Sequence, residues 1–302
     1  MVSVYCLAYN HEPFIRDALE GFVNQKTNFK YEVIVHDDAS TDGTANIIRE
    51  YANRYPDIIK PIFQTENQHS KKVPIMLRFI KPLMRGKYVA ACEGDDYWID
   101  DEKLQKQVDF LENNREYIAC TCNVDVIEMK DNSVRKFNSA TTEYDIDLYL
   151  LLKTWGSNMH LSALMYRMDA ADIIYSDKRP QFFKVSGGIG DYRLGIYLAL
   201  SGKIKYLPYT VSVYRHGTPG SWSDRHASNK ALIAMYNELS SIIEAAYKYY
   251  GLKNRLIFME MMARYKYRIY KIKNKTISAA VMRIIKYSYI LVNLLIRKVS
   301  NE

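Results

Sequence analysis

Three carboxylates stand within four residues in the segment Glu93-Gly94-Asp95-Asp96. Carboxylates this close repel one another unless a cation lies among them. Oxygen ligands of this kind suit Mg²⁺ or Mn²⁺, whose other coordination positions are filled by water and a diphosphate. Gly94 allows the backbone to turn and a ligand to approach closely. The alternative interpretation is structural, because Asp96 or Asp100 could cap a helix that begins near Glu102.

A second acidic group occupies residues 37–43, which read Asp-Asp-Ala-Ser-Thr-Asp-Gly. A carboxylate here could accept a hydrogen bond from the imide N–H of a nucleobase. An Asx turn or a helix cap would explain Asp42 equally well. Because a cap needs only one acid and three are present, Asp38 is the stronger candidate for binding a ligand.

Both acidic groups follow apolar runs that predict β-strands. Strands are expected at residues 2–7, 31–35, 58–63, 87–92 and 117–127, and helices at 13–25, after 44 and at 102–112. This alternation predicts a parallel sheet covered on both faces. Ligands of such sheets bind just beyond the carboxyl ends of the strands, where Tyr9-Asn10 and both acidic groups are placed. No G-x-G-x-x-G follows the first strand and no GxxxxGK[ST] occurs, which excludes a Rossmann dinucleotide site and a P-loop.

The second half of the chain gives weaker patterns. They predict a hairpin turn at 131–133, a short helix at 144–155, a strand at 161–166 and a helix at 168–175. Asp191 begins a predicted helix that runs to about residue 200, and it could be the N-cap of that helix. A further strand at 205–214 leads into Arg215, His216 and a loop rich in Gly and Ser.

The positive charge of the chain is concentrated near its C-terminus. The net charge is +8, but residues 261–301 contain ten Lys or Arg and no Asp or Glu. Subtracting these ten charges leaves −2 for the rest of the chain. A nucleic-acid-binding module, which the pI of 9.0 suggests, is therefore disfavoured because the body is slightly acidic.

Helices are expected at 231–250, 252–272 and 276–299. Lys and Arg mixed with Tyr, Ile and Leu predict that this tail binds an anionic membrane surface. The alternative is packing on the rest of the chain or on a second copy in a homo-oligomer. The uncharged run at 287–296 is about half of the ~20 residues that span a bilayer, so no transmembrane segment is expected there.

The four cysteines indicate a reducing compartment. Their spacing fits neither a disulfide scaffold nor a zinc site. The first ten residues lack the basic start and the long apolar run of a signal peptide. We therefore expect a cytoplasmic protein that is peripheral at the inner face of the plasma membrane.

Four ordered motifs carry a family resemblance: A-Y-N-H-E at 8–12, V-I-V-H-D-D-A-S-T-D-G-T at 33–44, G-K-Y-V-A-A-C-E-G-D-D-Y-W at 86–98 and G-D-Y-R-L at 190–194. Together they resemble the family 2 glycosyltransferases, which have the GT-A fold. The resemblance implies a Rossmann-like α/β catalytic domain at 1–224, with a mixed, mostly parallel sheet and flanking helices. Residues 225–302 would then form a C-terminal basic helical region.

The resemblance implies a metal-dependent, inverting hexosyltransferase. The donor would be a nucleotide-sugar, with a UDP-sugar favoured, and the acceptor a hydroxyl of a growing, lipid-linked cell-surface glycan such as capsule or O-antigen. A nucleotidyltransferase of similar fold is the alternative. Such enzymes usually have a Gly-rich, Arg/Lys-containing loop after the first strand, and residues 8–12 lack it.

The resemblance also assigns residue roles on the donor side. Asp38 would contact the base, and Asp95 would bind Mn²⁺ or Mg²⁺. Asp96 could share that metal or cap the loop, and His216 could be a further ligand or a structural residue. Glu93 stands where the family has the first Asp of its D-x-D motif, so it could contact the ribose or a metal-bound water instead. The remaining nucleotide-binding positions are Ala8, Tyr9, Asn10, Glu12 and Gly94.

On the acceptor side, the resemblance makes Asp191 the general base. The family usually has an acidic pair here, whereas this chain has Gly190-Asp191, so one acid is left. Arg215 could contact phosphate. Trp98 and Trp222 could form aromatic walls for a sugar ring, although either could equally belong to the core.

Overall fold

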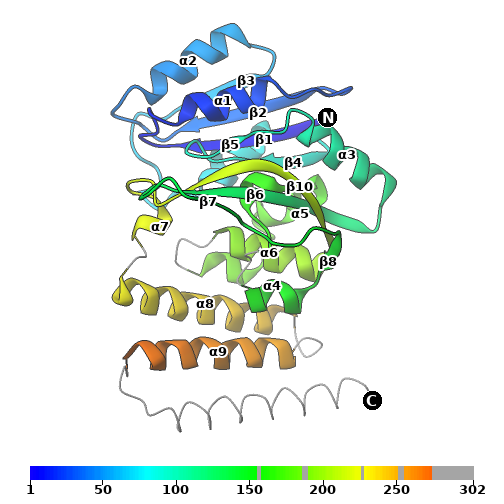
Figure 1. Cartoon of the computed structure of the whole chain (residues 1–302), viewed down its shortest axis with the longest axis vertical. Helices are drawn as coiled ribbons and strands as arrows, with labels where there is room; N and C mark the ends of the chain where they lie inside the picture. Colours follow the sequence, from blue (N-terminus) through cyan, green and yellow to red (C-terminus); the bar gives the residue numbers. More distant parts are fainter. Residues whose placement is uncertain (155–157, 186–189, 226–227, 251–254, 274–302) are drawn as a thin grey trace. The chain divides into compact units, whose positions relative to one another are not determined.

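The computed structural model describes residues 1–154, 158–185, 190–225, 228–250 and 255–273 (Figure 1). These residues form two compact units. The first comprises residues 1–179 and 194–221, and the second comprises 180–193 together with the described residues from 222 onwards. The expected third helix at 276–299 lies outside the described residues.

The first unit is built on a mixed sheet. Its strands are β1 (Val2–Ala8), β2 (Tyr31–Asp37), β3 (Ile59–Phe63), β4 (Tyr88–Ala91), β5 (Tyr97–Trp98), β6 (Tyr117–Glu128), β7 (Val134–Lys136), β8 (Tyr144–Ile146), β9 (Leu164–Arg167) and β10 (Lys203–His216). The spatial order is β3-β2-β1-β4-β9-β6-β10-β5, while β7 pairs with β6 and β8 with β10. The pairs among β3, β2, β1 and β4 are parallel, as is the long β6–β10 pair.

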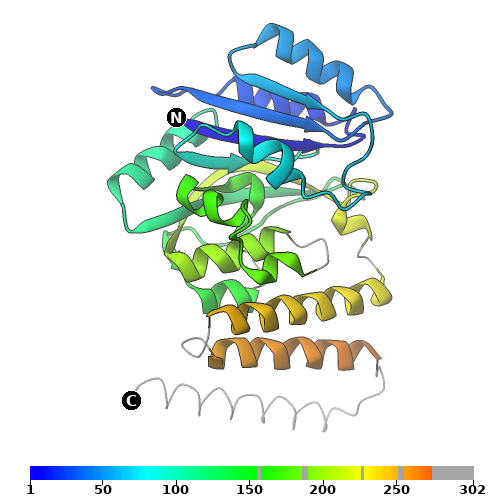
Figure 2. The ribbon, with the colours of Figure 1, turned by 180° about the vertical axis from the view of Figure 1, so that it is seen from behind.

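Helices flank the sheet of the first unit, and further helices belong to the second unit. The α-helices are α1 (Ile15–Val23), α2 (Thr44–Arg54), α3 (Lys103–Asn113), α4 (Leu148–Thr154), α5 (Met168–Ile174), α6 (Gly190–Ser201), α7 (Trp222–Arg225), α8 (Asn229–Tyr250) and α9 (Arg255–Lys273). Shorter turns are the π-helix η1 (Met76–Ile80) and the 3-10 helices η2 (Lys81–Leu83), η3 (Leu161–Ala163) and η4 (Gln181–Lys184). Helix α5 and the turn η1 lie on the face of the sheet that is turned toward the viewer in Figure 2.

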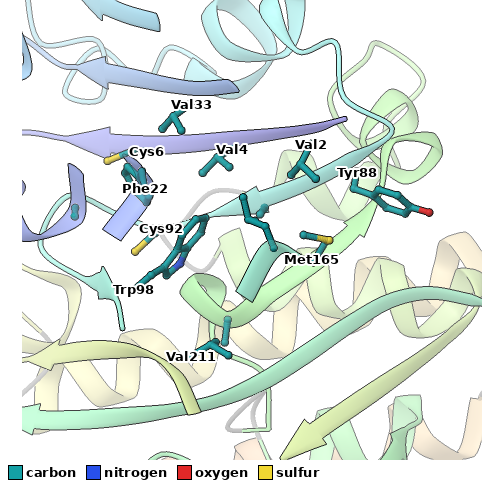
Figure 3. Packing of buried hydrophobic residues seen from close by; sticks show 14 of the residues in the cluster. Val2, Val4, Cys6, Phe22, Val33, Tyr88, Cys92, Trp98, Met165 and Val211 are labelled. Atoms are coloured by element: carbon teal, nitrogen blue, oxygen red, sulfur yellow. The ribbon is translucent and has the colours of Figure 1, made fainter. Parts of the chain in front are cut away.

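The core of the first unit follows from alternation along the strands. Val2, Val4 and Cys6 of β1 point to one face of the sheet, because successive side chains of a strand point to opposite faces. On that face they meet the buried stripe of α1, where Phe22 packs edge-on against Trp98 with ring centroids 4.9 Å apart (Figure 3). The same core contains Val33 and Val35 of β2 and Ala90 of β4.

The expected fold class is confirmed, and most expected elements are found within two or three residues of their predicted bounds. The predicted helix at 144–155 was wrong at its start. Tyr144–Ile146 is strand β8, paired antiparallel with β10, and the helix begins at Leu148. The Tyr144 ring stacks on Tyr206 at a centroid distance of 4.7 Å, so a cross-strand contact overrides the local helical pattern.

The predicted strand at 161–166 is also shorter than expected. Residues Leu161–Ala163 form η3, and β9 begins only at Leu164. The side chain of His160 accepts the N–H of Ser162, which stabilises a turn where the apolar pattern predicts extended chain. The four cysteines are free thiols, and all four are buried.

The second unit contains the pair of helices α8 and α9, close to the expected 231–250 and 252–272. The hydroxyls of Tyr192 and Tyr265 lie 2.7 Å apart, and Arg193 pairs with Glu238 at 3.2 Å. These contacts attach the start of α6 to the helical pair. Among the described residues, no helix has the length and apolar character needed to cross a membrane.

Candidate active site

The loops that follow β1 and β2 are joined by bonds between side chains and main chain. Oδ1 of Asn10 accepts the N–H of Thr41 at 2.8 Å, and Oε2 of Glu12 accepts the N–H of Gly43 at 2.7 Å. In the other direction, the N–H of Glu12 donates to Oδ2 of Asp42 at 3.1 Å. Asn10 has a φ of 56°, a left-handed conformation that asparagine tolerates better than most residues. Asn10 and Glu12 therefore shape this edge of the sheet.

Asp38 holds a third loop onto the same edge. Its own N–H donates to the carbonyl of Ala8, the last residue of β1, at 2.9 Å. Its carboxylate accepts the N–H groups of Gln68 at 2.8 Å and His69 at 2.9 Å, and the residue is 4% exposed. The expected base-binding acid is thus enclosed by its own chain. Tyr9, by contrast, is 45% exposed.

His11, which the sequence analysis did not single out, lies among these loops. Its Nδ1 is buried and has no hydrogen-bond partner within the part of the chain that the structure describes. Burial lowers the pKa of His11, while the nearby charges of Asp95, Asp42 and Asp37 act in the opposite direction. A Cβ at Gly94 would lie 2.8 Å from that Nδ1, so the ring needs a glycine there. The sequence feature that could have identified His11 is its position in the Y-N-H-E motif of residues 9–12.

The acidic segment follows β4 at the same edge. Asp95 and Asp96 are buried, whereas Glu93 is exposed. Desolvation, together with the charges of Asp95 and Glu93, raises the pKa of Asp96 well above its usual range. The N–H of Arg215 donates to Oδ1 of Asp96 at 3.0 Å and opposes this rise. Crowded carboxylates of this kind favour a nearby cation.

Arg215 at the end of β10, and Thr218 just after it, hydrogen-bond to the acidic segment. Nη1 of the buried Arg215 donates to the carbonyl of Asp95 at 2.8 Å, and Nη2 pairs with Asp17. The guanidinium group lies 4.4 Å from the ring centroid of Tyr97. The hydroxyl of Thr218 donates to Oδ2 of Asp95 at 3.0 Å. Arg215, the expected phosphate contact, is therefore engaged with protein partners.

Three further residues were expected to contact the metal or the substrates, namely His216, Trp98 and Trp222. Nδ1 of His216 pairs with Glu128 at 2.7 Å, so this ring faces β6. Trp98 is buried, and its Nε1 donates to the carbonyl of Ser162 at 2.8 Å, which fits the core-packing alternative. The side chain of Trp222 lies outside the described residues.

Asp191 belongs to the second unit. It lies in the first turn of α6, and its Oδ1 accepts the N–H of Tyr192 at 2.8 Å. The side chain is exposed, although desolvation raises the pKa of its carboxyl. Residues 186–189, which precede it, lie outside the described residues.

The acidic segment fits a divalent cation of the hard type. Among the described residues, no group of three or more His, Cys, Asp and Glu side chains is arranged to hold a metal ion. Mg²⁺-type sites commonly use only one or two protein carboxylates, with phosphates and waters as the other ligands. Asp95, with Asp96 beside it, provides such a partial donor set.

The family model for glycosyl transferase family 2 matches residues 3–173, which is more than half of the chain. The chain belongs to this family. This glycosyltransferase is 34% identical over 229 residues to the uncharacterized protein Rv1520 of Mycobacterium tuberculosis, an alignment that covers 76% of this chain and 62% of the relative. The chain thus spans less than two thirds of that relative's length.

Other similarities agree with the family and the fold. The Escherichia coli UDP-Glc:alpha-D-GlcNAc-diphosphoundecaprenol beta-1,3-glucosyltransferase WfaP is 29% identical over 119 residues, 39% of this chain and 44% of WfaP. The structure of Staphylococcus aureus TarS 1–349 in complex with UDP superposes with a TM-score of 0.61 at 17% identity, covering 91% of this chain and 73% of that one. The Pyrobaculum calidifontis mannosyltransferase PcManGT, in complex with GDP-Man and Mn²⁺, gives 0.60 at 17% identity, covering 96% and 79%.

Proposed function

We propose that this glycosyltransferase moves a sugar from a nucleotide-sugar, with a UDP-sugar favoured, to a hydroxyl of a lipid-linked cell-surface glycan. The acidic segment 93–96 carries the proposal, because its crowded carboxylates lie where β4 ends, beside the loops after β1 and β2. The name of WfaP, which states a UDP-sugar donor and a diphosphoundecaprenol acceptor, supports these substrate classes. The UDP complex of TarS supports the choice of nucleotide.

Asp95 would hold Mn²⁺ or Mg²⁺, with Asp96 and Glu93 adjacent. A bound cation supplies positive charge that stabilises the departing diphosphate. The loops around Asn10, Glu12 and Asp38 would present the surface against which the nucleotide lies. His11 would line the same edge, because its ring packs against Gly94.

Asp191 would act as the general base. It takes the proton of the acceptor hydroxyl while that hydroxyl attacks C1 of the sugar from the face opposite the diphosphate. Inversion at C1 follows, so an α-linked donor gives a β-linked product. A positioned base of this kind contributes about 10²–10⁴-fold. Desolvation raises the pKa of the Asp191 carboxyl, which is the direction that suits a base.

The residues 1–224 would form the catalytic domain, and the basic residues 225–302 would bind an anionic membrane surface at the cytoplasmic face. The division between units after residue 221 supports this arrangement, although residues 180–193 group with the helical unit. Lys266, Lys271 and Lys273 of α9 are exposed. Each basic residue near an anionic bilayer contributes about 1 kcal/mol.

The membrane proposal is tested by replacing Lys266, Lys271 and Lys273 with Gln and measuring cosedimentation with vesicles that contain anionic lipid. We expect weaker binding for the triple variant and none to vesicles of neutral lipid. Equal binding of the variant and the wild type would contradict it. Self-association of the wild type without vesicle binding would instead favour a second copy as partner.

The donor is tested with purified protein and UDP-, GDP-, dTDP- and CMP-sugars, each with Mn²⁺ or with EDTA. A ligand that binds the folded state raises its apparent stability. We expect thermal stabilisation by one nucleotide class, dependent on Mn²⁺, and release of the nucleoside diphosphate when acceptor is added. Full transfer in EDTA would refute the role given to Asp95.

A further inference from the structure

Thr218 contributes to the acidic segment from a distant part of the chain. Its hydroxyl donates to Oδ2 of Asp95 at 3.0 Å, across 123 residues of sequence. Thr218 is 2% exposed and Asp95 is 9% exposed, so water competes little with this bond. A carboxylate tied at one oxygen cannot turn freely about its terminal torsion. The bond therefore fixes the direction in which the rest of the Asp95 carboxylate points.

The backbone around Thr218 is specialised for this contact. Gly217 has a φ of +85° and Gly220 a φ of +76°, in the left-handed region that other residues rarely adopt. At both positions a Cβ would meet no atom within 4 Å. Conformation, and not lack of space, is therefore what calls for glycine on both sides of Thr218. The two glycines turn the chain so that the threonine side chain is directed inward.

The same stretch fixes the acidic segment at two further points. Arg215 donates from its guanidinium group to the carbonyl of Asp95 and from its N–H to Oδ1 of Asp96. Arg215 and Thr218 therefore both hydrogen-bond to this pair of consecutive acids. Thr218 alone among these contacts acts on the Asp95 carboxylate.

We infer that Thr218 is a positioning residue that orients the Asp95 carboxylate for the divalent cation. This inference rests on the proposed function, in which Asp95 binds that cation. Hydrogen bonds to the ligands of a metal orient them, and their loss typically costs about 10–100-fold in metal affinity or activity. A threonine gives no sequence signal for such a role, because its partner is set by folding.

The test compares Thr218→Val with Thr218→Ser. Valine removes the hydroxyl and keeps a similar shape, whereas serine keeps the donor. Mn²⁺ affinity is measured in the presence of UDP by the electron paramagnetic resonance signal of free Mn²⁺. We expect about a tenfold or greater loss for Thr218→Val and near wild-type affinity for Thr218→Ser.

Thr121→Val is the matched control. Thr121 is a buried threonine of β6 whose hydroxyl has no hydrogen-bond partner among the described residues. The same chemical change there should leave Mn²⁺ affinity unchanged. If Thr218→Val does not fold, Gly220→Ala serves as a second variant, because strain at a positive φ displaces Thr218. It should also weaken Mn²⁺ binding.

The outcomes separate this inference from the proposed function. Loss of Mn²⁺ binding in Asp95→Asn, with wild-type affinity in the folded Thr218→Val or Gly220→Ala variant, overturns the role of Thr218 alone. Wild-type affinity in Asp95→Asn overturns the metal role of Asp95, and the inference falls with it. Weaker binding in Thr218→Val and Asp95→Asn, but not in Thr121→Val, supports both.

Discussion

The ammonium group of Lys103 lies 4.3 Å from the centroid of the Trp98 ring, inside the apolar core. Its Nζ donates to Oε1 of Gln107 at 2.7 Å, and the residue is 0% exposed. Burial lowers the pKa of Lys103 to about 8. The contact with the aromatic face compensates the ammonium group for part of the hydration that it loses on burial. The compensation is incomplete, so the neutral amine is favoured above about pH 8.

This burial predicts a pH dependence of stability. Between the folded pKa of about 8 and the unfolded value of 10.5, the unfolded chain binds the extra proton. The contribution of Lys103 to the free energy of unfolding therefore rises with pH across this window, by at most about 3 kcal/mol. Burial also raises the pKa of the thiols, for example Cys92, which acts in the opposite direction above about pH 9.

The comparison with Lys103→Met isolates the lysine, because the thiols are common to both proteins. Urea unfolding at pH 7.5 and pH 10 should show that wild-type stability increases relative to the variant. A constant difference between the two proteins at both pH values would contradict the lowered pKa of Lys103.

Asp38→Ala should release the loop at residues 64–73. The N–H groups of Gln68 and His69, which are partly buried, lose their acceptor. An amide left without a partner costs about 1–3 kcal/mol where water cannot reach it and less where it can. Hydrogen exchange at these two amides should accelerate, and nucleotide affinity should fall. Asp57→Ala, at an exposed acid, is the control and should leave exchange unchanged. Unaltered exchange in Asp38→Ala would show that the loop is held by other contacts.

Asp191→Asn should keep nucleotide binding and lose transfer by about 10²–10⁴-fold, because the amide cannot accept the acceptor's proton. Single-turnover transfer, measured beside UDP binding, separates these effects. Asp177→Asn, another exposed acid, should transfer at the wild-type rate. Wild-type turnover in Asp191→Asn would remove this residue from the mechanism.

Gly94→Ala should destabilise the protein by about 1–3 kcal/mol, the usual cost of overpacking. The added Cβ would lie 2.8 Å from Nδ1 of His11 and 2.9 Å from Cδ1 of Ile15. Gly190→Ala, where a Cβ meets nothing within 4 Å, should be neutral or slightly stabilising. The midpoints of thermal unfolding of the two variants test this difference in stability. Equal midpoints would mean that the loop around His11 shifts at little energetic cost to make room for the added Cβ.

The sequence predicted those features that local periodicity and strand ends determine. The strands at the N-terminal half and the meeting of three polar groups at one edge follow from apolar runs and parallel topology. The partners of the polar groups could not be predicted in this way. Asp17 and Arg215 form an ion pair although 198 residues separate them in the sequence. Asp38 accepts hydrogen bonds from backbone amides of a loop, and no side-chain type in the sequence marks such amides as its partners. The strand β8 was missed for the same reason, since its stability depends on β10.

The hydrogen bonds between residues 10–12 and 41–43 run in both directions. Replacing an acceptor side chain in one stretch leaves a backbone N–H of the other stretch without a hydrogen-bond partner. A second substitution is then needed to provide a new acceptor. Among related enzymes we therefore expect these two short stretches to covary as one heritable unit, even where the sugar that is transferred has changed.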